Sequence, residues 1–224
     1  MDQDIGVYVS TTGNETAYTN PLLTGLYFLI ENGKYHHALN AYHLLFMTFI
    51  YQTLLKARSW RPRKFNNSLI PFSHRELSRA VLLTSTSCFI FSKINERSIF
   101  DYLAIFDVRD SLIAKCKKLV DNRNERSHAN GHYESDESLF SDKIGRYNEL
   151  CFSIHSKTCS FLGKIFADFI ADLSRNTELT DDDLELYLVT PNYLSSADLA
   201  FILSICSLQR KKHYKQVEQI INGY

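Results

Sequence analysis

The amino-acid sequence predicts an all-α protein, a bundle of about six or seven helices. Three observations lead to this prediction. Apolar residues recur at helical spacing over most of the chain. Only eight glycines and four prolines interrupt its 224 residues. Hydrophobic residues make up 45% of the sequence, which is enough for a sizeable core. We therefore expect no sheet larger than a hairpin.

The N-terminal quarter is divided by its helix-start and helix-stop residues. Residues 1–19 are rich in Thr, Gly, Asn and Tyr and lack a helical period, so they are expected to form an N-terminal arm. A single helical domain is expected over residues 20–224. Asn20 and Pro21 fit the N-cap and first position of a helix that ends at Gly33. A second helix is predicted from residue 34 to about residue 57, where apolar residues recur at helical spacing.

Two groups of residues could be taken for metal ligands, but each is better explained by its place in a helix. Adjacent histidines point to different sides of a helix, so His36, His37 and His43 are interpreted as core or surface residues. The acidic run Thr180-Asp181-Asp182-Asp183 precedes an apolar segment. Acidic residues favour the positive end of a helix dipole, so this run is expected to begin a helix. We expect no metal site and no cofactor.

A basic segment follows the second predicted helix and is interrupted by Pro62. Basic side chains contact phosphates, and an aromatic ring such as Trp60 can stack on an unpaired base. One interpretation is therefore a single-stranded RNA contact, and the other is an exposed interhelix loop. The residues assigned to RNA binding are Arg58, Trp60, Arg61, Arg63 and Lys64.

The central part of the chain contains one ambiguous stretch. Ser73 and Glu76 form a capping box that opens a third helix. Residues 80–92 are apolar and rich in Ser and Thr, a pattern that does not separate a helix from a buried strand. A helix is then predicted from Ser98 to about Asn122.

Two more helices are predicted in the C-terminal half. Apolar residues from Phe140 to Phe169 indicate a helix of about 35 residues, on the order of 50 Å long, which is suited to be the spine of a bundle or a dimer. Ser195 or Ser196 begins a last helix that continues to Ile221. A basic cluster on that helix is either a second RNA contact or a solvated face.

Charge and cysteine usage limit the classes of protein to which the chain can belong. The formal net charge is zero, so nucleic-acid binding requires a local basic patch. The five cysteines are widely spaced without a C-x-x-C pair and are expected to be reduced core thiols. The N-terminus lacks an apolar signal region, and no apolar run reaches the length of a membrane span. A cytoplasmic protein without a membrane association is expected.

The segment 121–131 separates the two long amphipathic patterns and carries the candidate catalytic residues. Arg123 and His128 are five positions apart, so continued helical geometry would direct both side chains to roughly one face. A guanidinium grips phosphate and an imidazole moves protons near neutral pH, so this pair can cleave a phosphodiester without a metal. Asn124 adds a neutral donor and acceptor. Arg126 and His132 make a second, overlapping match.

The run from Arg123 to His128, in which the arginine is followed directly by the polar residue Asn124, resembles the motif of HEPN-domain ribonucleases. The resemblance covers these six residues and the flanking helical patterns, about residues 97 to 173. It implies a HEPN-like helical bundle and an endoribonuclease in which the RNA 2′-hydroxyl is the nucleophile. His128 would be the general base or acid, Arg123 would stabilise the charge on the phosphate, and Asn124 would orient one of them.

The same resemblance implies a homodimer, RNA as the substrate, and a role in toxin–antitoxin or antiphage defence with an antitoxin or regulatory partner. Some HEPN toxins carry a tyrosine two residues after the histidine that a partner modifies. This chain has Asn130 there, with Tyr133 as the nearest ring, which argues against that mode of regulation. The alternative is a catalytically silent helical module that binds a partner protein or a nucleotide, with Arg123 capping a helix end.

Overall fold

The computed structural model describes residues 4–10, 15–68, 79–127, 136–173, 180–209 and 212–223. These residues are helical and contain no strand, which confirms the predicted all-α class. The six longest helices in this part of the chain are α1 (Thr16–Glu31), α2 (Tyr35–Trp60), α6 (Asp110–Ser127), α7 (Glu137–Leu173), α10 (Ser196–Ser207) and α11 (Lys212–Gly223).

Shorter helical segments connect these six helices and bring the total above the predicted six or seven. Five are short α-helices: α3 (Pro62–Ser68), α4 (Arg79–Thr84), α5 (Glu96–Ile99), α8 (Asp181–Leu184) and α9 (Thr190–Asn192). The 3-10 segments are η1 (Ile5–Val7), η3 (Cys88–Lys93) and η4 (Phe100–Phe106), and η5 (Glu185–Val189) is a π-helix. The ambiguous stretch 80–92 is thus α4 followed by η3.

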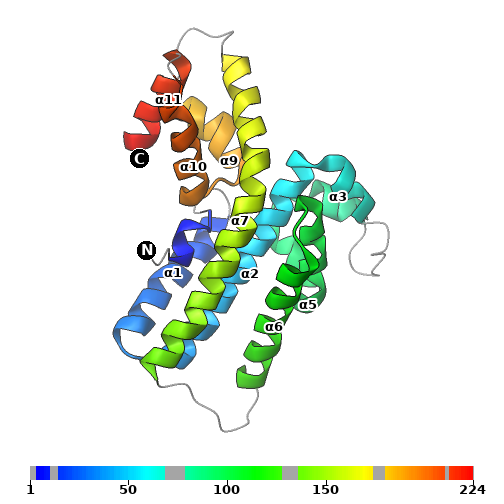
Figure 1. Cartoon of the computed structure of the whole chain (residues 1–224), viewed down its shortest axis with the longest axis vertical. Helices are drawn as coiled ribbons and strands as arrows, with labels where there is room; N and C mark the ends of the chain where they lie inside the picture. Colours follow the sequence, from blue (N-terminus) through cyan, green and yellow to red (C-terminus); the bar gives the residue numbers. More distant parts are fainter. Residues whose placement is uncertain are drawn as a thin grey trace.

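Helix α7 is the spine of the molecule, and α2 is its central helix. Figure 1 shows α7 running past α1 and α2 at one end and past α9, α10 and α11 at the other. Helix α2 is buried on all sides from residue 45 to residue 57. A helix that is buried all round must be surrounded by other elements. Helices α1 and α7 and the segments η3 and η4 supply that cover.

The buried apolar side chains form two clusters along this spine. The larger cluster contains η1, α2, η4, α6 and the first half of α7. The smaller one contains the second half of α7 together with α8, η5, α10 and α11. Trp60 packs against both clusters from the end of α2. The junction between the two clusters therefore lies beside Trp60.

Several predicted boundaries are confirmed. Gly33 has a left-handed φ of 64° at the end of α1, a conformation that glycine adopts without the steric cost of a Cβ. Ser195 caps α10 through a complete capping box with Asp198. Thr180 and Asp183 exchange hydrogen bonds at the start of α8, as expected for an acidic first turn. Helix α7 has 37 residues, close to the predicted length.

The first helix begins earlier than predicted, and part of the expected N-terminal arm packs into the bundle. Helix α1 starts at Thr16, so Pro21 lies inside it and is not its first residue. The added turn buries Thr19, and the side chain of Glu15 accepts a hydrogen bond from the Cys88 amide. Ser10 is buried and exchanges two hydrogen bonds with Gln52 of α2.

The single helix predicted from Ser98 to Asn122 is wrong. The chain forms α5 and η4, turns at Asp107, and restarts as α6 at residue 110. Asp107 has a left-handed φ of 59°, which Asp tolerates better than most residues. Five of the seven η4 residues are buried, more than one stripe of an amphipathic helix can hide. The helical spacing of Ile105 and Val108 continued across this turn by coincidence.

The last predicted helix is also two helices. Helix α10 ends at Ser207, and α11 begins at Lys212 and packs back against α10. Val217 and Ile221 of α11 are buried in the same cluster as Ile202 of α10. A straight continuation would carry these apolar residues away from that cluster, so burial favours the reversal.

The predicted capping box at Ser73 and Glu76 lies outside the described residues.

All five cysteines are buried and free, which confirms the prediction of core thiols. Within the described residues, no helix is long and apolar enough to cross a membrane.

Candidate functional site

Arg123 and Asn124 lie in the last two turns of α6. Asn124 is exposed, and the side chain of Arg123 is 26% exposed. Helix α6 continues through Ser127, so the backbone of the motif is helical up to that residue. His128 lies outside the described residues, as does His132 of the overlapping match. The predicted convergence of Arg123 and His128 therefore stays a prediction.

The guanidinium of Arg123 is held by a partner that the sequence analysis did not identify. Its Nη2 donates to the Oε2 oxygen of Glu96 in α5, an ion pair between neighbouring helices. The same oxygen lies 3.6 Å from Nε2 of His43 in α2. His43 is buried, and its Nδ1 lies 3.0 Å from the Tyr147 hydroxyl of α7. A polar chain thus leads from α6 through α5 and α2 to α7.

The carboxyl group of Glu96 is ionised in this setting. The neighbouring imidazole of His43 lowers the pKa of Glu96, and the partial burial of Glu96 opposes that shift. The neighbouring guanidinium of Arg123 lowers the pKa further. One negative charge therefore lies between an imidazole and a guanidinium. It fixes the position of Arg123 and also competes with any phosphate that approaches the guanidinium.

Sequence reasoning could identify only part of this arrangement. His43 was interpreted as a core or surface histidine, and its burial confirms the core alternative. Glu96 precedes Arg123 by 27 positions and belongs to a different helix. No helical spacing relates the two residues, so no sequence signal predicts their contact.

The basic segment assigned to RNA binding is helical and is not a loop. It consists of the end of α2 and the start of α3, with Pro62 at the first position of α3. Proline is well accommodated there, because the first N–H groups of a helix lack intrahelical partners. The side chain of Trp60 is half-buried, and its Nε1 donates to Oδ1 of Asn192 at 2.9 Å.

The other predicted RNA-binding side chains have mostly intramolecular partners. Arg58 donates to backbone carbonyls in residues 82–85. Arg61 donates to the Ile105 carbonyl and, together with Lys64, forms ion pairs with Asp107. These contacts hold α2 and α3 against η4. Arg63 is exposed, and within the described residues its side chain makes no ion pair.

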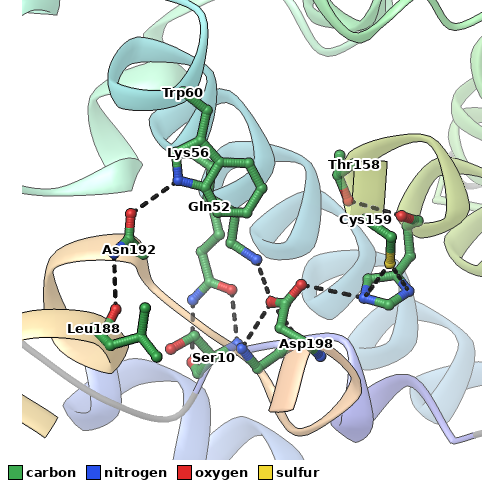
Figure 2. Close-up of polar contacts among 11 residues, drawn as sticks. Ser10, Gln52, Lys56, Trp60, Thr158, Cys159, Leu188, Asn192 and Asp198 are labelled. Carbon is green, nitrogen blue, oxygen red and sulfur yellow. Dashed lines mark hydrogen bonds and ion pairs between the residues drawn. The ribbon is translucent and has the colours of Figure 1, made fainter. Parts of the chain in front are cut away.

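A second polar constellation, which the sequence analysis missed, lies between α2, α7 and α10. Asp198 is fully buried, and Lys56 is 5% exposed. The two side chains point toward one another, with Nζ of Lys56 at 2.5 Å from the carboxylate (Figure 2). The Ser195 amide and hydroxyl also donate to this carboxylate, and Nε2 of His155 lies 3.2 Å from it.

Cys159 and His155 are close to this carboxylate, which resembles a Cys-His-Asp catalytic arrangement. The Cys159 sulfur lies 3.5 Å from Nδ1 and 3.6 Å from Nε2 of His155. Burial raises the pKa of the Cys159 thiol to about 12, and the charge of Asp198 contributes to the rise. A nucleophilic cysteine requires a thiolate, which a raised pKa disfavours. We therefore assign this group to the structure and not to catalysis.

The described part of the chain contains no cluster of three or more His, Cys, Asp or Glu side chains placed to hold a metal ion. Comparisons with protein-family models, curated proteins and solved structures found no match to this chain. The functional assignment therefore depends on the motif residues and their surroundings.

Proposed function

We propose that the protein is a metal-independent endoribonuclease of HEPN type that uses Arg123, Asn124 and His128. The observation that carries the proposal is the position of Arg123 and Asn124 in the last two turns of α6, where both reach solvent. His128 directly follows Ser127, the last described residue of α6, in the sequence. The end of α6 thus presents a guanidinium and an amide, and the histidine of the motif follows four residues after Asn124 in the sequence.

In the proposed reaction, the RNA supplies its own nucleophile. His128 takes the proton of the 2′-hydroxyl, or returns a proton to the leaving group, while the 2′ oxygen forms a bond to phosphorus. The bond from phosphorus to the 5′ oxygen breaks, and that oxygen is protonated. Arg123 stabilises the negative charge that accumulates on the phosphate, and Asn124 orients one of the two groups. The products are a 2′,3′-cyclic phosphate and a 5′-hydroxyl.

The proposal includes a cytoplasmic homodimer that joins two copies of the site and is controlled by an antitoxin or other regulatory protein. Each pair of Arg123 and His128 would supply one half of a composite cleft. The length of α7 supports a dimer, because a helix of 37 residues offers a surface for pairing.

A second candidate function is a silent module that binds a partner protein or a nucleotide. The ion pair of Arg123 with Glu96 favours it, because a guanidinium committed to a carboxylate joins α6 to α5 without any substrate. The two functions make opposite predictions for cleavage by the purified protein.

The decisive experiment measures RNA cleavage by wild type, Arg123→Ala and His128→Ala in excess EDTA, with end-group analysis of the products. We expect wild-type cleavage to persist and each variant to lose on the order of 10²-fold or more in rate. Arg97→Ala is a matched control, because Arg97 is an exposed arginine of α5 that pairs with Asp121. Loss of cleavage on chelation, or equal rates in all variants, would contradict the proposal.

A further inference from the structure

A groove of about 290 Å³ runs between α6 and α7 and carries an excess of positive charge. Lys115 and Lys118 line it from α6, and Arg146 lines it from α7. Among the described residues, Glu149 is the only acidic one that lines it, so three cations face one carboxylate. Helices α6 and α7 are in contact. In Figure 1, α6 is the green helix, and α7 is the long helix that runs from yellow-green to yellow.

The three cations of the groove have no internal counterion in the part of the chain that the structure describes. Within the described residues, Lys115, Lys118 and Arg146 make no ion pair or hydrogen bond through their side chains, and all three are exposed. The side of α6 that faces α5 and η4 differs. There Lys117 pairs with Asp101, and Arg123 pairs with Glu96. Helix α6 thus has one neutralised side and one side whose charge is available to an external anion.

The rest of the groove lining suits a nucleotide chain. Leu119 and Leu150 supply buried apolar surface, and Asn122 and Ser153 supply polar groups. Unpaired nucleotides present apolar base faces together with phosphates and hydroxyls, which a mixed lining of this kind can contact. An acidic peptide would need the charges but not the apolar floor.

We propose that this groove binds the backbone of single-stranded RNA and delivers it to the motif. The proposal rests on the proposed function for the identity of the scissile strand. Asn122 lines the groove and directly precedes Arg123 in α6. From Lys115 to Arg123 the helix rises by about 12 Å at 1.5 Å per residue. That distance corresponds to a few nucleotides. Arg123 lies one residue, about 100°, around the helix from Asn122, so the strand would leave the groove at its Asn122 end and pass around α6 to the motif. The RNA contact then lies on α6 and α7, apart from the basic segment of α2 and α3.

The test measures binding of a short, labelled single-stranded RNA of mixed sequence to three full-length proteins as a function of salt. All three carry His128→Ala so that the RNA stays intact. One has no other change, and one carries Lys115→Gln, Lys118→Gln and Arg146→Gln. The third is a control that loses the same number of charges at exposed lysines outside the groove, with Lys93→Gln, Lys157→Gln and Lys164→Gln.

We expect the groove variant to bind at least tenfold more weakly near physiological salt. Its salt dependence should decrease by about two units, because each phosphate contact to a single strand contributes about 0.7. The control should bind within about twofold of its parent if the groove carries the contacts. Glu149→Gln should strengthen binding, because it removes the one opposing charge. Melting temperatures of all variants should match, since the changed side chains are exposed.

Three results would overturn the inference. The first is that the parent does not bind RNA, and the second is that the groove variant and the control lose RNA affinity equally. The third is that the groove substitutions weaken binding of polyglutamate, an acidic peptide, as much as they weaken binding of RNA. Cleavage by wild type tests the proposed function separately. If wild type fails to cleave while the groove variant alone loses RNA affinity, the proposed function is wrong and the groove assignment stands. If wild type cleaves and both triple variants bind alike, only the groove assignment is wrong.

Discussion

Replacing Asp198 by asparagine should destabilise the protein more than any other single removal of charge that we consider. The carboxylate is fully buried and accepts from Lys56, from the amide and hydroxyl of Ser195, and from His155. An asparagine offers one acceptor oxygen and directs its NH₂ group at donors. Lys56 would be left as a buried charge without a counterion, because its side chain is only 5% exposed.

The expected magnitude is about 3 to 5 kcal/mol of unfolding free energy, the range for removing one partner of a buried ion pair. In a chain of this length, that loss corresponds to a fall in melting temperature of roughly 6 to 20 °C. Urea unfolding at pH 7 measures the free energy. Asp101→Asn is the matched control, because Asp101 pairs with Lys117 at an exposed position and should cost less than about 1 kcal/mol.

The pH dependence gives an independent check. Lys56 and the hydrogen bond from His155 outweigh the cost of burial and hold the pKa of Asp198 well below its usual range. A depressed folded-state pKa stabilises the protein above the unfolded value of about 3.9, and this contribution is lost as pH falls below it. Wild type should therefore converge on Asp198→Asn only below about pH 4.

A double-mutant cycle with Lys56→Met completes the test. Lys56→Met should reduce the unfolding free energy less in the Asp198→Asn background than in wild type. In wild type it breaks the ion pair, whereas in Asp198→Asn it removes a buried ammonium that has already lost its carboxylate. If Asp198→Asn is as stable as the Asp101→Asn control at pH 7, the reasoning about this buried pair is refuted.

Three further predictions concern the basic segment and the motif. Trp60→Ala should lower the unfolding free energy by about 2 to 4 kcal/mol in urea titrations and leave RNA affinity unchanged, because the indole joins the two apolar clusters. Arg61→Gln should lower the melting temperature, whereas Arg63→Gln should change unfolding free energy by less than about 0.5 kcal/mol, since only Arg61 has internal partners among the described residues. Glu96→Gln should strengthen RNA binding, measured by titration, because it frees the guanidinium of Arg123 from a competing carboxylate; weaker binding would show that Glu96 positions this group.

The parts of the fold that follow from local chemistry could be predicted from the sequence. The positive φ at Gly33, the capping box at Ser195 and the continuous helical period of α7 each depend on residues within a few positions of one another. The breaks at Asp107 and near Leu208 could not be predicted in this way. Neither contains a proline or glycine, and both are favoured by the burial of distant apolar residues.

The same distinction applies to the polar sites. Lys56 lies just before the basic segment in the sequence, yet its partner Asp198 lies 142 positions away. A buried lysine in a helix that is apolar on all sides requires a counterion, but only the three-dimensional fold identifies it. Arg123 and Glu96 are likewise distant in the sequence, 27 positions apart, and meet only in the folded protein. Composition and spacing identify which groups carry charge, whereas the packing of helices decides which of those charges are neutralised.

This distinction decides where an external anion can bind. Net charge gives no guidance, because the chain has equal numbers of basic and acidic residues. The basic segment of α2 and α3 has four Lys or Arg residues within seven positions, but Asp107 and backbone carbonyls bind three of them. The cations of the α6 and α7 groove are fewer and more widely spaced in sequence. They are nevertheless available, because the helix packing places no carboxylate in ion-pair contact with them among the described residues. An RNA-binding surface is therefore better predicted from unpaired charge than from basic residues counted along the chain.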